Sequence, residues 1–134
     1  MTLAEVVVAL AIAGLAVAGI INGYMFCARS TERSALSQAA NAMALARLEE
    51  TRGAKWDPAG YPPVDQLVAT SFPNQVVILD RSGSGAGITY ATNITQISQI
   101  STNPPLKRIH VDCVWRFNGS QRITNSIETC RAPN

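Results

Sequence analysis

One acidic side chain stands alone in a long apolar stretch near the start of the chain. Residues 1–28 read MTLAEVVVALAIAGLAVAGIINGYMFCA, and Glu5 is the only charged residue among them. A carboxylate in lipid costs about 3 kcal/mol or more unless it is paired, so such a residue usually marks a function with a specific partner. The chemistry that this position supports is therefore ion pairing or hydrogen bonding away from water.

No set of residues in the remaining chain has the spacing of a catalytic centre. His110 is the only histidine, and it is predicted on the polar face of a strand, without a nucleophile motif beside it. The glycine-rich run 83–87 lacks the following helix and lysine of a phosphate-binding loop. Five acidic residues are too scattered for a calcium loop: Asp57, Asp65, Asp80, Asp112 and Glu128. We expect no enzyme activity, no metal and no cofactor.

The apolar stretch that holds Glu5 is long enough to span a bilayer as a helix. Its first cation is Arg29. A secretory signal would carry a positive segment first and a shorter apolar core, but no Lys or Arg precedes this run. We therefore expect a chain from which a basic leader has been removed.

A single helix is predicted from residue 1 to about residue 52, because no proline interrupts it and Gly53 is suited to its C-cap. Three glycines lower the helix propensity of the apolar part: Gly14, Gly19 and Gly23. They allow the helix to bend or lose hydrogen bonds in an assembly, or they permit close helix packing. The sequence leaves both interpretations open.

The second half of this helix, residues 29–53, is amphipathic. Leu36, Ala40, Met43 and Ala44 share one face, with Leu48 at its edge. We expect that face to pack on a sheet, and the stem of Arg47 to pass along it toward water. A second stripe suits helix packing in a polymer core, or reflects helix propensity alone: Ala35, Ala39, Ala42 and Ala46.

The rest of the chain, residues 54–134, predicts a small sheet domain. Prolines make residues 54–74 rich in turns, strands are expected at 76–79 and 88–94, and residues 99–105 read as a linker. The strongest strand is 107–117, whose inward residues are Ile109, Val111, Cys113, Trp115 and Phe117. The predicted fold is α+β, with one long N-terminal helix packed on a four-stranded antiparallel sheet.

Side-chain parity sets the last hairpin. A three-residue loop at 118–120 pairs Ile123 with Trp115 and Ile127 with Val111, whereas a two-residue loop would turn both isoleucines to the polar face. This arrangement also places Cys130 beyond the regular ladder.

The chain has three cysteines and a net charge of +2. Cys27 is expected as a buried free thiol, with an intermolecular bridge as the alternative. Cys113 and Cys130 either pair in an oxidising compartment or stay reduced. The basic residues of the last strands suggest a solvated sheet face rather than a nucleic-acid site: Lys107, Arg108, Arg116, Arg122 and Arg131. Asn93 and Asn118 each begin a glycosylation sequon.

The first residues, Met1-Thr-Leu-Ala-Glu5-Val-Val-Val-Ala-Leu-Ala-Ile12, resemble the N-terminus of the type IV pilin superfamily, which includes the pseudopilins of type II secretion. The resemblance implies cleavage by a prepilin peptidase and methylation of Met1. It implies that Glu5 neutralises the N-terminal amine of a neighbouring subunit, although Glu5 could instead cap its own helix. It also favours a C-terminal loop closed by a Cys113–Cys130 disulfide.

The chain departs from the family pattern at Asn22, where many members have a proline that kinks the helix. The acidic cluster of the calcium-binding pseudopilins is not recognisable. The run Ala44-Leu-Ala-Arg-Leu-Glu-Glu50 resembles minor pseudopilins, so a minor pilin or pseudopilin is one alternative function.

The resemblance implies a structural subunit of an extracellular filament. Its partners would be other copies of the chain, the assembly machinery and the prepilin peptidase, with no nucleic acid. The subunit would reside in the bacterial inner membrane and then at the cell surface, or in a periplasmic pseudopilus. A membrane-anchored binding module that never polymerises is the second alternative.

Overall fold

The structure is a computed structural model that describes residues 2–81 and 87–133. The chain divides into two compact units, Met1–Ala35 and Leu36–Asn134, and each is described by itself. One helix, α1, runs from Leu3 to Arg52 and contributes to both. Its end confirms the predicted stop before Gly53, whereas the compact sheet-bearing unit begins earlier, at Leu36.

The first unit consists of the apolar part of α1 and the mostly polar residues 29–35 that follow it. Every residue from Thr2 to Ala35 is exposed, including Leu15 at 75% and Phe26 at 75%. This helix is long and apolar enough to cross a membrane, by length and composition alone. The helix is continuous through Gly14, Gly19 and Gly23, so the predicted weakening in an assembly stays a prediction.

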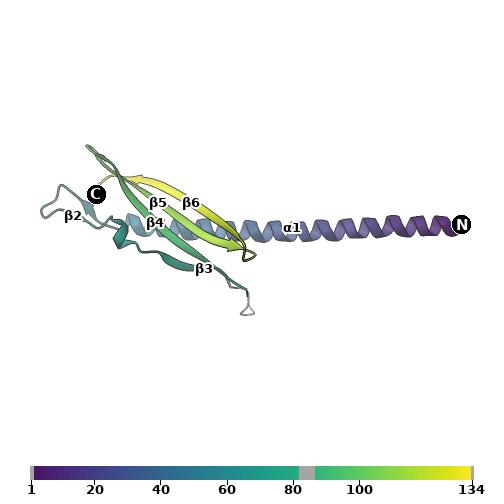
Figure 1. The fold of residues 1–134 in the computed structure, drawn as a ribbon. Coiled ribbons are helices and arrows are strands. Elements are labelled where there is room, and N and C mark those ends of the chain that lie inside the picture. The colour runs from purple at the N-terminus through teal and green to yellow at the C-terminus, as the bar shows by residue number, and fades with distance from the viewer. Residues whose placement is uncertain (1, 82–86, 134) are drawn as a thin grey trace. The chain divides into compact units, whose positions relative to one another are not determined.

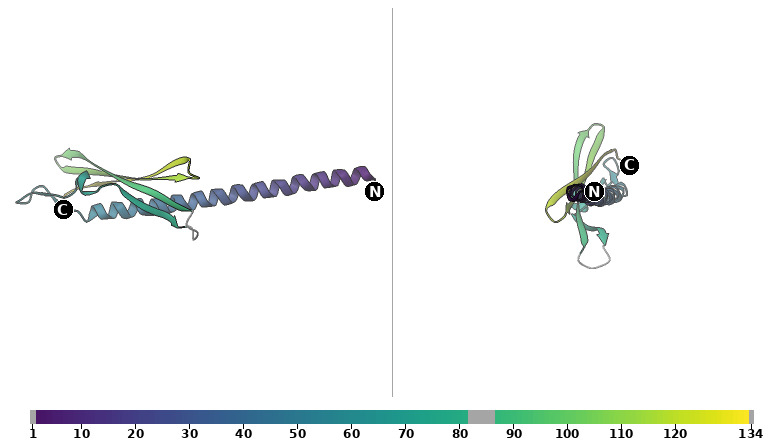
Figure 2. Two further views of the ribbon diagram at one scale, coloured as in Figure 1. Left: turned by 60° about the horizontal axis from the view of Figure 1, so that its bottom comes forward. Right: turned by 90° about the vertical axis from the view of Figure 1, so that its right-hand side faces the viewer.

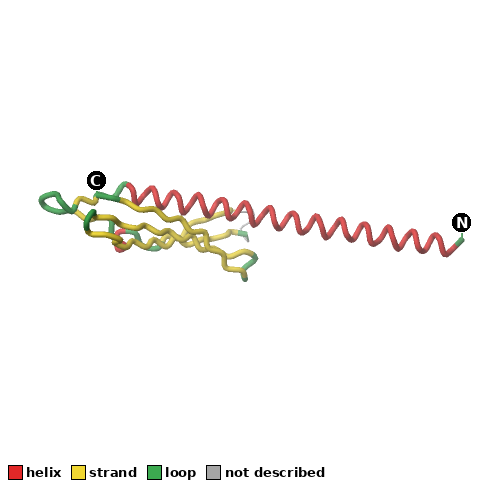
Figure 3. The backbone as a smooth tube through the Cα atoms, turned by 90° about the horizontal axis from the view of Figure 1, so that it is seen from above, coloured by secondary structure: helices red, strands yellow, loops and turns green. Residues whose placement is uncertain are grey.

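The second unit is a four-stranded antiparallel sheet with the strand order β3-β4-β5-β6 (Figure 1). The strands are β3 (Gln75–Arg81), β4 (Ile88–Thr102), β5 (Pro105–Phe117) and β6 (Gln121–Arg131). The last turns of α1, from Leu36 to Arg52, lie along one face of the sheet (Figures 2 and 3). The predicted α+β fold, a long helix packed on a four-stranded antiparallel sheet, is confirmed.

The core forms between the predicted faces of α1 and the central strands. The helix contributes Leu36, Ala40, Ala44 and Leu48. Alternate residues of β5 face it and are buried, as parity predicted: Ile109, Val111, Cys113, Trp115 and Phe117. Met43 packs against this cluster at its margin. The helical spacing and the strand alternation thus select the same two faces.

The predicted linker at 99–105 is wrong. β4 continues to Thr102 and β5 begins at Pro105, with Thr102 opposite Pro105 in the ladder. Asn103 and Pro104 form the turn. The paired strands extend past the apolar alternation because backbone hydrogen bonds, and not side-chain burial, continue the ladder there.

The last hairpin confirms the predicted three-residue loop. Asn118 and Gly119 adopt positive φ angles of 49° and 71°. Trp115 stands opposite Ile123, and Val111 opposite Ile127. β6 therefore turns its isoleucines to the core side, as the parity argument required.

Two long cations are buried instead of solvated. Arg47 is 8% exposed and donates hydrogen bonds to Thr95 Oγ1 at 3.3 Å and to the Pro73 carbonyl at 2.6 Å. Its guanidinium lies 5.4 Å from the centroid of the Phe72 ring. The expectation that Arg47 reaches water is wrong, because the segment before β3 covers the end of the side chain.

Lys107 fixes the segment between the helix and the sheet. This segment forms a short hairpin, β1 (Trp56–Asp57) with β2 (Val64–Asp65), which the prolines did not suggest. Lys107 Nζ donates to both carboxylate oxygens of Asp65, at 2.7 and 2.6 Å, and to the Leu67 carbonyl at 2.7 Å. It also lies 4.8 Å from the centroid of the Trp56 ring.

Candidate functional site: Glu5 and the apolar helix

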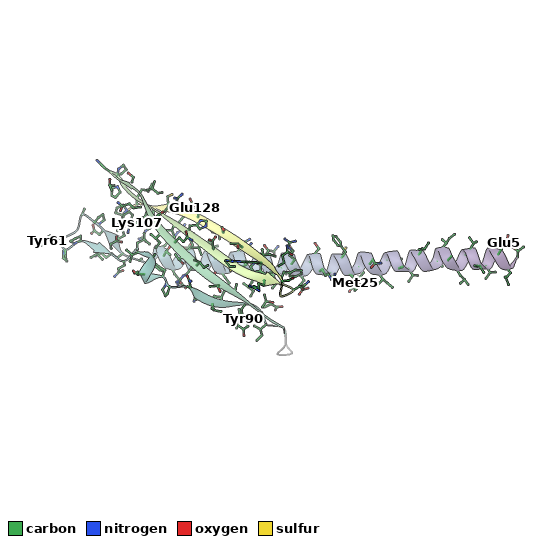
Figure 4. The ribbon with its side chains drawn as sticks, viewed as in Figure 1. Glu5, Met25, Tyr61, Tyr90, Lys107 and Glu128 are labelled. Atoms are coloured by element: carbon green, nitrogen blue, oxygen red, sulfur yellow. The ribbon has the colours of Figure 1, made fainter. Side chains whose placement is uncertain are left out.

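Glu5 lies in the first turn of α1, where Figure 4 shows it at the N-terminal end of the helix. The Thr2 backbone N–H donates to Glu5 Oε2 at 2.7 Å, and Glu5 N–H donates to the Thr2 carbonyl at 3.1 Å. Thr2 thus stands at the N-cap and Glu5 three residues later, which is the spacing of a capping box. A carboxylate there also meets the positive end of the helix dipole.

The arrangement leaves Glu5 able to serve a second donor. Only Oε2 receives the Thr2 N–H, the residue is exposed, and an ionised carboxylate has acceptor sites on both oxygens. Met1, the predicted source of the amine and of the methylated terminus, lies outside the described residues. The geometry can therefore place an anionic oxygen, held by the helix end, at the surface of an apolar rod.

The apolar side chains around this carboxylate are exposed on all sides of the helix. Among the nearest are Leu3 at 86%, Val8 at 57% and Ile12 at 62%. A helix that is apolar all round belongs in an apolar environment, either lipid or a bundle of other helices. The described residues of this unit supply no such cover.

The predicted disulfide between Cys113 and Cys130 is wrong. Both thiols are free, Cys113 buried and Cys130 exposed. Cys130 does not lie beyond the ladder: it is part of β6 and stands opposite Arg108, whereas Cys113 stands opposite Asn125. Arg108, the partner of Cys130, lies five residues from Cys113 along β5. The two cysteines are therefore roughly 17 Å apart, well beyond the Cα separation that a disulfide spans. They also belong to opposite faces of the sheet, because their side-chain parities differ.

Burial changes the chemistry of the inner thiol. Desolvation raises the pKa of Cys113 from 9.0 to about 11, because the thiolate loses its hydration inside the core. Cys113 is therefore an inert packing group at neutral pH. Cys27 is exposed on the apolar helix, so the predicted burial of its thiol does not occur within this chain.

His110 lies in a cross-strand cluster of polar side chains on the outer face of the sheet. Nδ1 is 3.2 Å from Glu128 Oε2 and Nε2 is 3.0 Å from Asp112 Oδ1. Ser126 donates its hydroxyl proton to the same Asp112 oxygen. The Ser126 hydroxyl thus donates to a carboxylate and not to the imidazole, so the cluster lacks the hydroxyl–imidazole bond of an activated serine nucleophile. No group with metal-ligand geometry occurs among the described residues.

The basic residues of the last strands do not form one patch. Lys107 points to the inner face with Ile109, whereas Arg108, Arg116 and Arg122 are exposed. The sequence signal was available, since Lys107 shares the parity of the buried residues of β5. What the sequence did not show is that Asp65 would supply the opposing charge.

The two glycosylation sequons differ in access. Asn93 is 1% exposed and donates from Nδ2 to the Met43 carbonyl at 3.3 Å, so the folded domain hides it from a glycosyltransferase. Asn118 is exposed in the hairpin loop.

Comparisons with protein families, with characterised proteins and with solved structures found no match.

Proposed function

We propose that this chain is a structural subunit of a type IV pilin-like filament. The apolar helix holds the subunit in the membrane before assembly and then enters a bundle of identical helices. The sheet domain covers the outside of that bundle. The same apolar surface therefore meets lipid first and neighbouring subunits later.

The observation that carries this proposal is the exposure of the whole segment from Thr2 to Ala35, with one carboxylate in its first turn. An ordinary membrane anchor requires apolar side chains but has no use for Glu5. Burying a carboxylate beside an amine relieves the desolvation of both, and removing one partner leaves the other uncompensated at a cost of about 3–5 kcal/mol. Glu5 thus sets the axial position at which a new subunit docks.

The bond from Thr2 to Glu5 fits a two-step role for this carboxylate. Before assembly, Glu5 caps its own helix through Oε2. During assembly, its other oxygen accepts the N-terminal amine of a neighbouring copy. The cap also restricts the Glu5 side chain, which lowers the entropy cost of forming the intermolecular pair.

The direct test replaces Glu5 by Gln, which keeps the shape and can still accept the Thr2 N–H but loses the charge. We expect Glu5→Gln cells to retain the protein in the membrane fraction and to lose sheared surface filaments. Glu32→Gln is the matched control, because Glu32 is an exposed acid on the same helix. Normal filaments in the Glu5→Gln strain, seen by electron microscopy, would contradict the proposal.

Abundance in sheared filaments separates the main subunit from the minor alternatives. Mass spectrometry should find this chain as the predominant component, beginning at a methylated Met1. Traces at one end of filaments built from another protein would instead indicate a minor pilin or pseudopilin. Wild-type protein that stays in the membrane, with no filaments at all, would indicate an anchored binding module.

A further inference from the structure

The two edges of the sheet differ in how they are protected. β3 carries a register irregularity between Ile78 and Asp80, and bulges of this kind disturb pairing with a further strand. β6 pairs with β5 in unbroken register from Gln121 to Arg131 and contains no proline. No strand pairs with its other side in the part of the chain that the structure describes.

The side chains of β6 show what a partner on that edge would meet. Ile123 and Ile127 face the core but are only partly buried, so the core remains open at this edge. Arg122 and Glu128 are exposed on the outer face. Glu128 contacts His110 at 3.2 Å and Arg108 at 3.9 Å, both on the neighbouring strand (Glu128 is labelled in Figure 4). No ion pair is found for Arg122 among the described residues.

We propose that β6 pairs antiparallel with β6 of a second copy of this chain, about a two-fold axis through Asn125. In that register, Arg122 of each copy stands opposite Glu128 of the other. Ile123 of each copy likewise stands opposite Ile127 of the other. The two-fold axis thus produces two Arg122–Glu128 pairs and two Ile123–Ile127 pairs. The partner strand also covers the open edge of each core.

Neighbouring registers lose this match. A slip of two residues places Arg122 opposite Ser126 or Cys130, and it separates the isoleucines. A slip of one residue puts inward side chains of one copy opposite outward side chains of the other. Cross-strand pairs of opposite charge and of β-branched residues contribute about 0.2–1 kcal/mol each, so the complementary register is favoured by several such pairs.

A two-fold contact has a direct structural consequence. It joins chains that run in opposite directions, whereas successive subunits of a filament all point the same way. The β6 contact therefore links two filaments side by side, or two unassembled chains. The inference does not rest on the proposed filament, because it uses only the sheet edge.

Disulfide trapping tests both the contact and its register. The background is the full-length chain in detergent with Cys27→Ser and Cys130→Ser, which removes the exposed thiols and leaves buried Cys113. In the proposed register, position 124 of one copy lies opposite position 126 of the other. We expect Thr124→Cys chains mixed with Ser126→Cys chains to form a cross-linked dimer, and each alone to give little.

The single variants also identify the wrong registers. Efficient cross-linking of Thr124→Cys alone, or of Ser126→Cys alone, indicates a register slipped by two residues and overturns the proposal. The absence of a cross-link in the mixture at high protein concentration overturns the contact itself.

Charge reversal provides an independent test of the register, measured as the cross-linking yield in the mixture of Thr124→Cys and Ser126→Cys chains. Arg122→Glu or Glu128→Arg creates two like-charge contacts and should lower the cross-linking yield by about fivefold. The combined reversal restores both pairs and should restore the yield. Lys55→Glu is the control, since this exposed residue lies outside β6 and outside its neighbouring strand. Equal loss with Lys55→Glu, or no rescue in the double variant, contradicts the proposal.

The two proposals can fail separately. Glu5→Gln leaves β6 unchanged, so cross-linking between positions 124 and 126 should persist in that variant. Loss of filaments with persistent cross-linking supports both proposals. Loss of cross-linking in Glu5→Gln would show that the β6 contact depends on filament assembly, and it would overturn the claim that the contact uses the sheet edge alone.

Discussion

The two parts of α1 follow different rules although the helix is continuous. From Thr2 to Ala35 no side chain is buried, and from Val6 to Ile21 apolar side chains point in every direction. From Leu36 to Arg52, one face is buried and the other is exposed and carries most of the polar residues. The difference shows that apolar content alone does not decide which residues form this chain's core. Helical spacing does, and the segment without such spacing contributes no residue to the core.

Truncating one leucine in each part should give the largest contrast. Leu48 is 3% exposed, so Leu48→Ala should lower the free energy of unfolding of the sheet domain by about 2–5 kcal/mol. Leu15 is 75% exposed, so Leu15→Ala should change it by less than about 0.5 kcal/mol. Both changes are measured by denaturant titrations of the full chain in detergent, with the fluorescence of the two buried tryptophans, Trp56 and Trp115, as the signal.

The comparison fails if the two substitutions destabilise the sheet domain equally. That result would mean that the apolar segment packs on the domain. Leu45→Ala is an added control, because Leu45 lies between core positions but is 49% exposed.

A second contrast concerns cations at the end of α1. Arg47→Met removes the donor to the buried Thr95 hydroxyl, to the partly buried Pro73 carbonyl and to Glu50. It should cost about 1–3 kcal/mol of unfolding free energy, because these acceptors lose their partner. Arg52 forms an exposed pair with Glu49, with side chains 58% and 51% exposed. Arg52→Met should therefore change stability by at most about 0.5 kcal/mol. Urea titration measures both, and an equal effect would contradict the buried role of Arg47.

The sequence predicted the fold where periodicity and burial act together. The faces of Leu36–Leu48 and of Ile109–Phe117 follow from spacing alone, and parity determined the loop at 118–120. The sequence did not predict the contacts between polar side chains that lie far apart along the chain. Arg47 with Thr95, and Lys107 with Asp65, are pairings that only the folded chain brings together, because many other opposite charges could have met.

The candidate site shows a different limit. Glu5 was identifiable because a charge in an apolar run is conspicuous, and Thr2 three residues before it carried the capping signal. The disulfide prediction is wrong because the resemblance behind it carries no information on the register of β5 and β6, which separates Cys113 from Cys130. Once β6 pairs with β5 through Arg131, Cys130 is fixed far from Cys113.

The buried thiol gives a pH-dependent test within the sheet domain. Burial raises the pKa of Cys113 from 9.0 to about 11, so the folded state holds the thiol proton more tightly than the unfolded state. Its contribution to stability is complete below pH 9.0 and is lost as the pH rises toward about 11. Wild type should therefore lose about 2 kcal/mol more than Cys113→Ala over that interval.

Exposed Cys130 supplies the matched control for this measurement. Cys130→Ala should keep the wild-type alkaline decline in denaturant titrations at successive pH values, because removing an exposed thiol leaves the titration of Cys113 in place. An unchanged decline in Cys113→Ala would show that other groups cause it.

The smallest contrast compares two glycines. Gly119 has a φ of +71°, which strains any residue with a Cβ, so Gly119→Ala should destabilise the sheet domain by about 1 kcal/mol. Gly14 is helical and a Cβ there meets nothing within 4 Å. Gly14→Ala should therefore stabilise the isolated helix by about 1 kcal/mol, measured as increased helicity in detergent by circular dichroism. If Gly14→Ala raises helicity yet reduces filament assembly, Gly14 is needed either for close contact with another copy or for bending of the helix in the filament. If assembly is unchanged, Gly14 has no role there, and the predicted weak point of the helix is wrong.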